Sequence, residues 1–155
     1  MNHGQLLQRI DTAWTALQAS YGGMSDEQLT TPGVVGEWSI KDILAHITDW
    51  EEEALHHLPT MMAGKRPPRY AATGGIDAFN ARKSEENRQR SLAEVLQRHE
   101  AIHQQLIDFV ARVPEEFIRT DTRFRHRLRL DTYGHYPLHT AAIREWEMTK
   151  GEQGE

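Results

Sequence analysis

Hydrophobic residues recur every three or four positions in several long stretches of this chain, which is the spacing of one apolar face on an amphipathic helix. The first stretch covers residues 6–21. The second begins after Ser39, which with Asp42 forms a capping-box sequence, and we expect Pro59 and then residues 64–68 to end it. These two stretches predict two long helices in the first half of the chain.

Two more amphipathic stretches lie in the second half. One covers residues 76–113, and the capping-box sequence that begins at Ser91 predicts a break within it. Residues 115–131 alternate weakly between polar and apolar, but no second strand pattern exists to pair with them, so we interpret them as a crossover loop. Asp131 or Thr132 is then expected to cap the last helix. Four long amphipathic helices without a credible sheet predict an all-α four-helix bundle with long crossover loops.

The length and composition fit one globular domain. The chain has 155 residues, of which 38% are hydrophobic and 26% are charged, an ordinary balance for a soluble protein. We expect a single helical-bundle domain over residues 1–150 and a polar C-terminal tail at residues 151–155.

Charge, hydropathy and cysteine content narrow the classes of function. The formal net charge is -5, so charge does not indicate a nucleic-acid partner, and we expect none. No apolar run approaches the roughly 18 residues that a membrane span requires, and the N-terminus does not resemble a signal peptide, so we expect no membrane partner and a cytoplasmic location. The chain has no cysteine. Any metal must therefore bind to histidine or carboxylate side chains.

The strongest chemical signal is a pair of histidines near the C-terminus. His135 and His139 are four residues apart, so on a helix they project from the same face. Ala142 and Trp146 continue that face, which points the pair towards the interior. Two inward imidazoles one turn apart suit a divalent metal ion, because both are neutral nitrogen donors at neutral pH. The alternative is that both are ordinary core or surface histidines.

A third metal ligand would have to come from the second helix, where His46 is the best candidate. At 100° per residue, His46 lies about 60° from Ile43, on the flank of the apolar stripe. Asp49 and Glu53 share that flank, and either carboxylate could act as a catalytic base beside the metal. Simple surface solvation is the alternative for both acids. Three histidine ligands would leave coordination positions open, as catalytic metal sites do.

Two further histidines form a rival pair. His99 and His103 are also four residues apart, within the apolar stripe of the third stretch. That stripe is otherwise aliphatic, which favours core histidines over metal ligands at these positions.

Short motifs near both ends of the chain resemble a known family. Residues 38–46 read WSIKDILAH, and residues 133–139 read YGHYPLH. Together these runs resemble the DinB-like superfamily of bacterial four-helix-bundle proteins. The middle of the chain, from FNA at residues 79–81 to RSLAEVL at residues 90–96, is similar to the ClbS/DfsB branch of that superfamily. The likeness extends over about residues 6–146.

The resemblance implies a bundle with a divalent-metal site, often zinc or nickel, and carries that site onto His46, His135 and His139. The superfamily includes thiol-dependent transferases and hydrolases taken to be metal-dependent. The resemblance therefore implies a metal-dependent hydrolase or transferase that acts on a small, electrophilic or toxic molecule. ClbS-type relatives protect their host from a genotoxin by opening its reactive cyclopropane. The alternative function is accordingly a non-catalytic or metal-free protein that binds a small molecule and protects against it.

Two further expectations accompany the resemblance. A thiol cofactor would need a basic anchor, for which the four arginines between residues 123 and 129 are candidates. Independently of the resemblance, we expect that the chain can form a homodimer. One departure affects the metal site, because Pro137 disfavours helical geometry at Tyr136 and lacks a backbone donor. If the last helix begins at Pro137 instead of near Asp131, His135 precedes it and the one-turn argument weakens.

Overall fold

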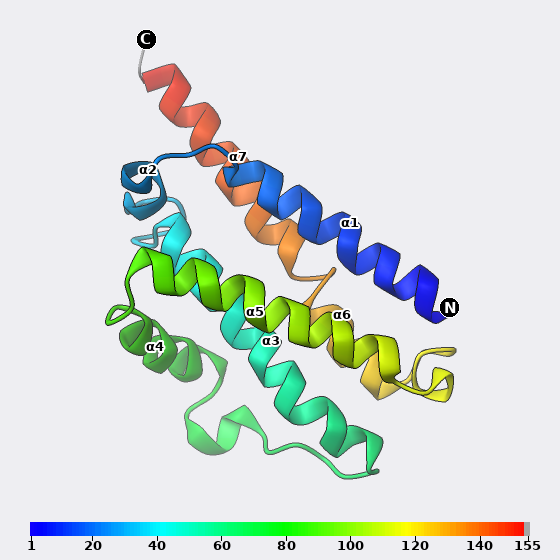
Figure 1. The fold of residues 1–155 in the computed structure, drawn as a ribbon. Helices are drawn as coiled ribbons and strands as arrows, with labels where there is room; N and C mark the ends of the chain where they lie inside the picture. The colour runs from blue at the N-terminus through cyan, green and yellow to red at the C-terminus, as the bar shows by residue number, and fades with distance from the viewer. Residues whose placement is uncertain (154–155) are drawn as a thin grey trace.

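The computed structural model describes residues 1–153 and shows a bundle of four long helices (Figure 1). These are α1 (His3–Tyr21), α3 (Ile40–Met62), α5 (Leu92–Arg112) and α7 (Tyr136–Gln153). Short helices lie in the connections between them: α2 (Asp26–Thr30), η1 (Tyr70–Thr73), α4 (Ile76–Asn87), η2 (Glu115–Phe117) and α6 (Arg123–Asp131). Within residues 1–153 there is no β-strand beyond an isolated bridge between Val35 and Trp38. The predicted all-α four-helix bundle with long crossovers is confirmed.

The direction of the helices explains the long crossovers. In Figure 1, α3 and α5 run the same way, while α1 and α7 run the opposite way. Since α3 packs against α5, the chain must return along the whole bundle between them, and η1 and α4 lie on this return path. In the same way α1 packs against α7, and α6 packs against α3. The helices α3, α4 and α6 thus come together around one part of the bundle.

The predicted helix starts after Ser39 and Ser91 are both confirmed. Each serine hydroxyl accepts a hydrogen bond from the backbone N–H three residues on, and the acidic side chain at that position accepts one from the serine N–H. The helix α3 continues past Pro59 to Met62 and ends just before residues 64–68, the second of the two expected stops. A proline in the last turn costs only one backbone hydrogen bond, and the neighbouring Leu58 is fully buried, so packing sustains the helix.

The crossover-loop interpretation of residues 115–131 is wrong, because these residues contain the helix α6. Phe124 and Leu128 are buried and lie four residues apart, so they form the inner face of a short amphipathic helix that a two-residue alternation conceals. Asp131 is the last residue of α6, and α7 begins at Tyr136. Neither Asp131 nor Thr132 caps the last helix.

The C-terminal tail prediction falls partly outside the structure. Residues 151–153 continue α7, and residues 154–155 lie outside the described residues. In the part of the chain that is described, no helix is both long and apolar enough to cross a membrane.

Candidate metal centre and the adjoining cavity

Three histidines from two long helices and the loop before α7 converge in the bundle. The Nε2 atom of His135 lies 3.2 Å from Nε2 of His46 and 2.9 Å from Nε2 of His139. One ligand nitrogen from each ring lies within 4.8 Å of the others, and all three side chains are half-buried. The Trp38 ring lies beside the His46 ring, with ring centroids 4.9 Å apart. The structure therefore brings together the three residues that the sequence suggested as ligands.

The two C-terminal histidines meet although they do not share a regular helix. Tyr136 is the first residue of α7, so His135 precedes the helix, as the Pro137 argument allowed. A tight turn places His135 instead: its N–H donates to the Thr132 carbonyl at 2.8 Å, and its own carbonyl accepts from Leu138 at 3.2 Å. This turn, and not the spacing of a regular helix, keeps His135 next to His139.

Gly134 makes that turn possible. Its N–H donates to the Arg129 carbonyl at 2.8 Å, which caps the end of α6. A Cβ atom at position 134 would lie 2.7 Å from this carbonyl oxygen, closer than real Cβ contacts come. The close approach of two backbone segments therefore requires glycine here.

The electrostatic environment keeps the three imidazoles neutral. Burial, together with repulsion from the other two rings, lowers the pKa of His46 to about 3. Burial and the neighbouring His139 lower the pKa of His135 to about 4, and burial alone lowers that of His139 to about 4. At neutral pH the cluster therefore offers uncharged nitrogen donors.

This donor set fits a divalent metal ion. Nitrogens bonded to one ion at about 2.0–2.1 Å lie roughly 2.8–3.4 Å apart for bond angles between about 90° and 110°. The Nε2 separations of 2.9 Å between His135 and His139 and of 3.2 Å between His46 and His135 fall in that range. A neutral imidazole has one N–H, so three converging Nε2 atoms cannot all pair with one another. A shared cation would satisfy all three lone pairs.

A cavity of about 440 Å³ opens beside the histidine cluster. Trp50 and Tyr70 form an aromatic wall, with ring centroids 5.2 Å apart, and Phe79 packs against both rings. The cavity is lined by residues from α3, η1, α4, α6 and the turn before α7: His46, Trp50, Tyr70, Ile76, Asn80, Arg127, Leu130, Asp131 and His135. Its size and mixed lining are those of a small-molecule site.

An ion pair that the sequence did not reveal lies in this cavity. Arg127 Nε donates to Asp131 at 2.6 Å, and its Nη2 donates to the Tyr70 hydroxyl at 2.8 Å. The guanidinium also lies 6.0 Å from the ring centroid of Trp50. Burial raises the pKa of Asp131 to about 6, although Arg127 opposes the shift. The four-residue spacing of Arg127 and Asp131 was the available signal. It indicates an ion pair only on a helix, and the sequence pattern of this segment predicted a loop.

The two carboxylates suggested as catalytic bases lie in different surroundings. The Asp49 carboxylate accepts from Asn87 Nδ2 at 2.8 Å and from Arg98 Nη1 at 3.3 Å, and it does not line the cavity. Burial raises its pKa, and these two partners oppose that shift. Glu53 accepts from the Tyr70 hydroxyl at 3.2 Å, so it lies directly behind the aromatic wall.

The rival pair His99 and His103 belongs to the core. Both rings stack on Trp14, at centroid separations of 4.4 and 3.5 Å. His99 Nδ1 lies 2.9 Å from the Thr48 hydroxyl, and His103 Nδ1 lies 2.8 Å from the fully buried Glu51. Each ring therefore has a protein partner within the packed core.

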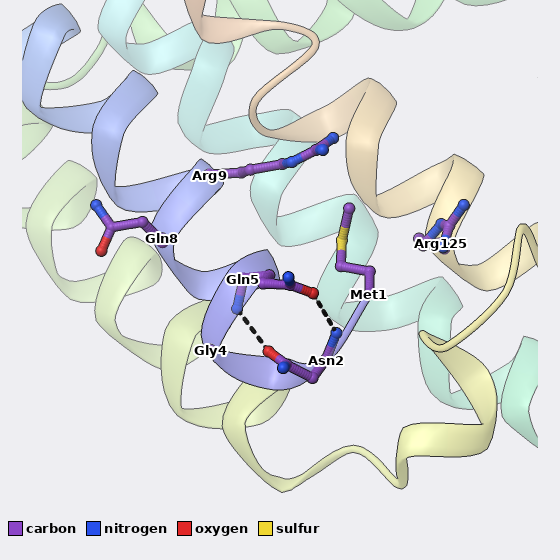
Figure 2. A pocket seen from close by; sticks show the side chains of 7 residues that line it. All are labelled: Met1, Asn2, Gly4, Gln5, Gln8, Arg9 and Arg125. Carbon is purple, nitrogen blue, oxygen red and sulfur yellow. Dashed lines mark hydrogen bonds between the residues drawn. The ribbon is translucent and has the colours of Figure 1, made fainter.

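A second hollow lies between the start of α1 and the helix α6 (Figure 2). It is open to solvent and has a volume of about 790 Å³. Its lining residues are Met1, Asn2, Gly4, Gln5, Gln8, Arg9 and Arg125. Figure 2 shows Arg9 and Arg125 on either side of Met1, and the two hydrogen bonds by which Asn2 and Gln5 cap α1. Of the four arginines between residues 123 and 129, Arg127 lines the cavity beside the histidines and Arg125 lines this hollow. They therefore do not form one anchor for a thiol cofactor.

Comparisons with known proteins agree with this architecture. The family model described as the DinB superfamily matches residues 9–142. A search of curated proteins found no match. Among solved structures, "Sibling Lethal Factor Precursor - DfsB" is similar with a TM-score of 0.80 and 16% identity, over 97% of both chains. The "colibactin self-resistance protein ClbS in complex with a dsDNA" is similar with a TM-score of 0.76 and 15% identity, over 93% of this chain and 94% of that one.

A third structure, of an uncharacterised protein from Escherichia coli UTI89, is similar with a TM-score of 0.74 and 13% identity, over 97% of this chain and 95% of that one. At such identities these likenesses show the fold. The resemblance to the DinB-like superfamily is confirmed, and the resemblance to the ClbS/DfsB branch is confirmed for the fold.

The expectation of no nucleic-acid partner is contradicted, because a protein of this fold has been crystallised with double-stranded DNA. The expectation relied on the net charge of -5, which sums over the whole chain. A net charge says nothing of a local face such as the hollow that contains Arg9 and Arg125.

Proposed function

The chain belongs to the DinB superfamily, and from this premise we propose that it binds a small molecule in the cavity beside its three converging histidines and protects against that molecule. The observation that carries the proposal is the cavity of about 440 Å³, which His46 and His135 border on one side and the aromatic wall of Trp50 and Tyr70 on another. A concave site that combines aromatic surface with a few polar groups is typical of small-molecule binding.

The comparison with ClbS supports the protective part of this proposal. That protein is described as a self-resistance protein, and its fold covers nearly the whole of this chain. Binding alone can protect, since a molecule enclosed in the cavity is withheld from other targets. The proposal therefore does not require turnover.

We further propose that His46, His135 and His139 hold a divalent metal ion, with zinc or nickel as the favoured ions. The fit rests on the spacing of the three Nε2 atoms and on their neutral state at pH 7. When bound, such an ion would supply Lewis-acid polarisation of a polar group of the bound molecule.

A second candidate function is a metal-dependent hydrolase or transferase. It is favoured by a ligand set of only three histidines, which leaves room for a substrate, and by carboxylates around the cavity. Glu53, through the Tyr70 hydroxyl, and Asp49, beside Asn87 and Arg98, are the proposed proton acceptors. Asp131 is a third carboxylate, and it lines the cavity directly. Replacing each by its amide should lower the turnover rate while metal content stays unchanged.

Duplex DNA is a further partner to test, because the ClbS neighbour was crystallised with it. In this chain the hollow with Arg9 and Arg125 is the basic surface that would contact phosphates. Fluorescence anisotropy with a labelled duplex, at low and at moderate salt, would measure binding. A paired Arg9→Ala and Arg125→Ala variant should weaken any such binding.

The decisive experiment separates metal, ligand and turnover. Protein purified without a histidine tag is analysed for metals, and ligand binding is then measured by calorimetry with a panel of electrophilic small molecules. We expect about one metal ion per chain, and we expect at least one member of the panel to bind in the cavity. Stoichiometric binding without product formation supports the protective binding protein. Metal-dependent product formation favours the enzyme instead, and absence of binding to any member contradicts the proposal.

A further inference from the structure

The rim of the cavity beside the histidines is unusually apolar. Large hydrophobic side chains of this protein are mostly buried, and among the described residues only five are exposed: Val35, Ile76, Leu130, Leu138 and Met148. Two of these five, Ile76 and Leu130, line the same cavity, although they come from the start of α4 and from the last turn of α6. They keep 54% and 51% of their surface exposed. Two separate elements thus present aliphatic surface at one opening, where water contacts it unless a ligand covers it.

The cavity also contains a few polar side chains, and its charged groups are matched. The Arg127 guanidinium is paired with Asp131 and bonded to the Tyr70 hydroxyl, so the two opposite charges offset each other. Asn80 accepts from Trp50 Nε1 at 3.0 Å through Oδ1. Its Nδ2 group has no hydrogen-bond partner among the described residues, so it can donate to an acceptor on a ligand. An uncharged polar group suits these surroundings better than a charged one, which would be desolvated without a counter-ion.

We propose that the molecule bound here is uncharged and amphipathic, with an apolar segment that packs on Ile76 and Leu130 and a polar end that reaches Asn80 and the histidines. This inference rests on the proposed function, because it specifies the ligand class of the same cavity. The concave shape favours a small molecule over a protein partner, which would need a far larger apolar surface than these two side chains provide.

The test uses unbranched acyl hydroxamic acids, which are uncharged at neutral pH and carry a metal-binding end. The butyryl, hexanoyl and octanoyl compounds are titrated calorimetrically into the full-length protein, with and without added zinc. We expect affinity to rise about two- to fourfold for each methylene that the rim covers. The same rise is expected without zinc, because it comes from the rim.

Variants locate the effect. Ile76→Ser and Leu130→Ser should each remove most of the gain in affinity with chain length. Leu138→Ser is the matched control, since Leu138 is 68% exposed but does not line the cavity. A gain that survives in both rim variants, or that is lost equally in the control, overturns the inference.

Two more outcomes are informative. Octanoate of the same chain length should bind at least about tenfold more weakly than the octanoyl hydroxamic acid in the absence of zinc. If octanoate binds more tightly, the ligand class is anionic and the inference is wrong. If no compound of the series binds to metal-loaded protein, or if binding shows no chain-length effect, the inference is wrong. The proposed function fails only if the panel of electrophilic molecules also does not bind.

Discussion

The imidazole ring of His103 lies flat on the indole ring of Trp14, with ring centroids 3.5 Å apart and an interplanar angle of 4°. The edge of the same imidazole ring makes a polar contact, because His103 Nδ1 lies 2.8 Å from Glu51. The Tyr136 hydroxyl donates to the same carboxylate at 3.2 Å. Burial raises the pKa of Glu51, while its hydrogen bond and charge interaction with His103 oppose that shift. Tyr136 follows the metal-site residue His135, so a buried polar network lies directly behind the histidine cluster.

Removing Trp14 should destabilise the fold strongly. Trp14→Ala deletes a buried ring that both core histidines contact, so we expect the free energy of unfolding to fall by about 3–5 kcal/mol. Trp146→Ala should cost less, because that side chain is only partly buried and stacks with Lys150 at the surface. Urea unfolding of the metal-free proteins measures both. A larger loss for Trp146 than for Trp14 would show that the stack on Trp14 does not anchor the core.

Acid should destabilise the protein through His99. Burial lowers the pKa of His99 to about 3, against about 6.5 in the unfolded chain. The unfolded state therefore binds a proton that the folded state does not, and stability is lost as pH falls from about 6.5 to about 3. Near pH 5 this one residue contributes a slope of about 1.4 kcal/mol per pH unit.

The His99→Gln variant tests this slope. Urea unfolding at several values between about pH 4.5 and pH 6.5 should show a shallower pH dependence in the variant than in the parent protein. Asp131 acts with the opposite sign, since its raised pKa of about 6 makes stability fall as pH rises from about 4 to about 6. It is present in both proteins and cancels in the comparison. The exposed His56→Gln is the control, and an equal change in both variants would refute the assignment to His99.

Removing one histidine of the cluster should abolish metal uptake. His139→Ala leaves two nitrogen donors, too few for tight binding, while the apolar faces of the bundle remain. Elemental analysis should show loss of the metal, and circular dichroism should show nearly unchanged helix content. His126→Ala, at an exposed position of α6, should retain the metal. Full metal loading of the His139 variant would exclude this cluster as the site.

A single methyl group at position 134 should disturb the cluster from a distance. Gly134→Ala places a Cβ atom against the Arg129 carbonyl, so the turn that carries His135 must shift. We expect metal affinity to fall by about tenfold or more, the scale seen when groups that orient metal ligands are altered. Competition with a chelating dye gives the affinity. Gly4→Ala, whose nearest contact is the Asn2 side chain at 3.4 Å, is the control, and equal affinities in the two variants would contradict the role of the turn.

The sequence by itself determined three of the long helices and two of their caps. The apolar stripes of α1, α3 and α5, and the serine caps at Ser39 and Ser91, depend on residues three or four positions apart, which interact locally in any helix. It also indicated His46, His135 and His139 as a set, because their phases point to the interior. The pattern failed at α6, where Phe124 and Leu128 are too few to mark a helix.

Only the tertiary structure decided how the candidate site is built. The hydrogen bond from Arg127 to Tyr70, and the stacking of His103 on Trp14, join residues from different elements. The meeting of His135 with His139 depends on a turn that Gly134 permits, and the helical spacing that suggested it does not apply there. Local spacing fixes which face of a helix a side chain occupies. Which other face it meets is set by the packing of the whole bundle, and this packing is not encoded in any short stretch of sequence.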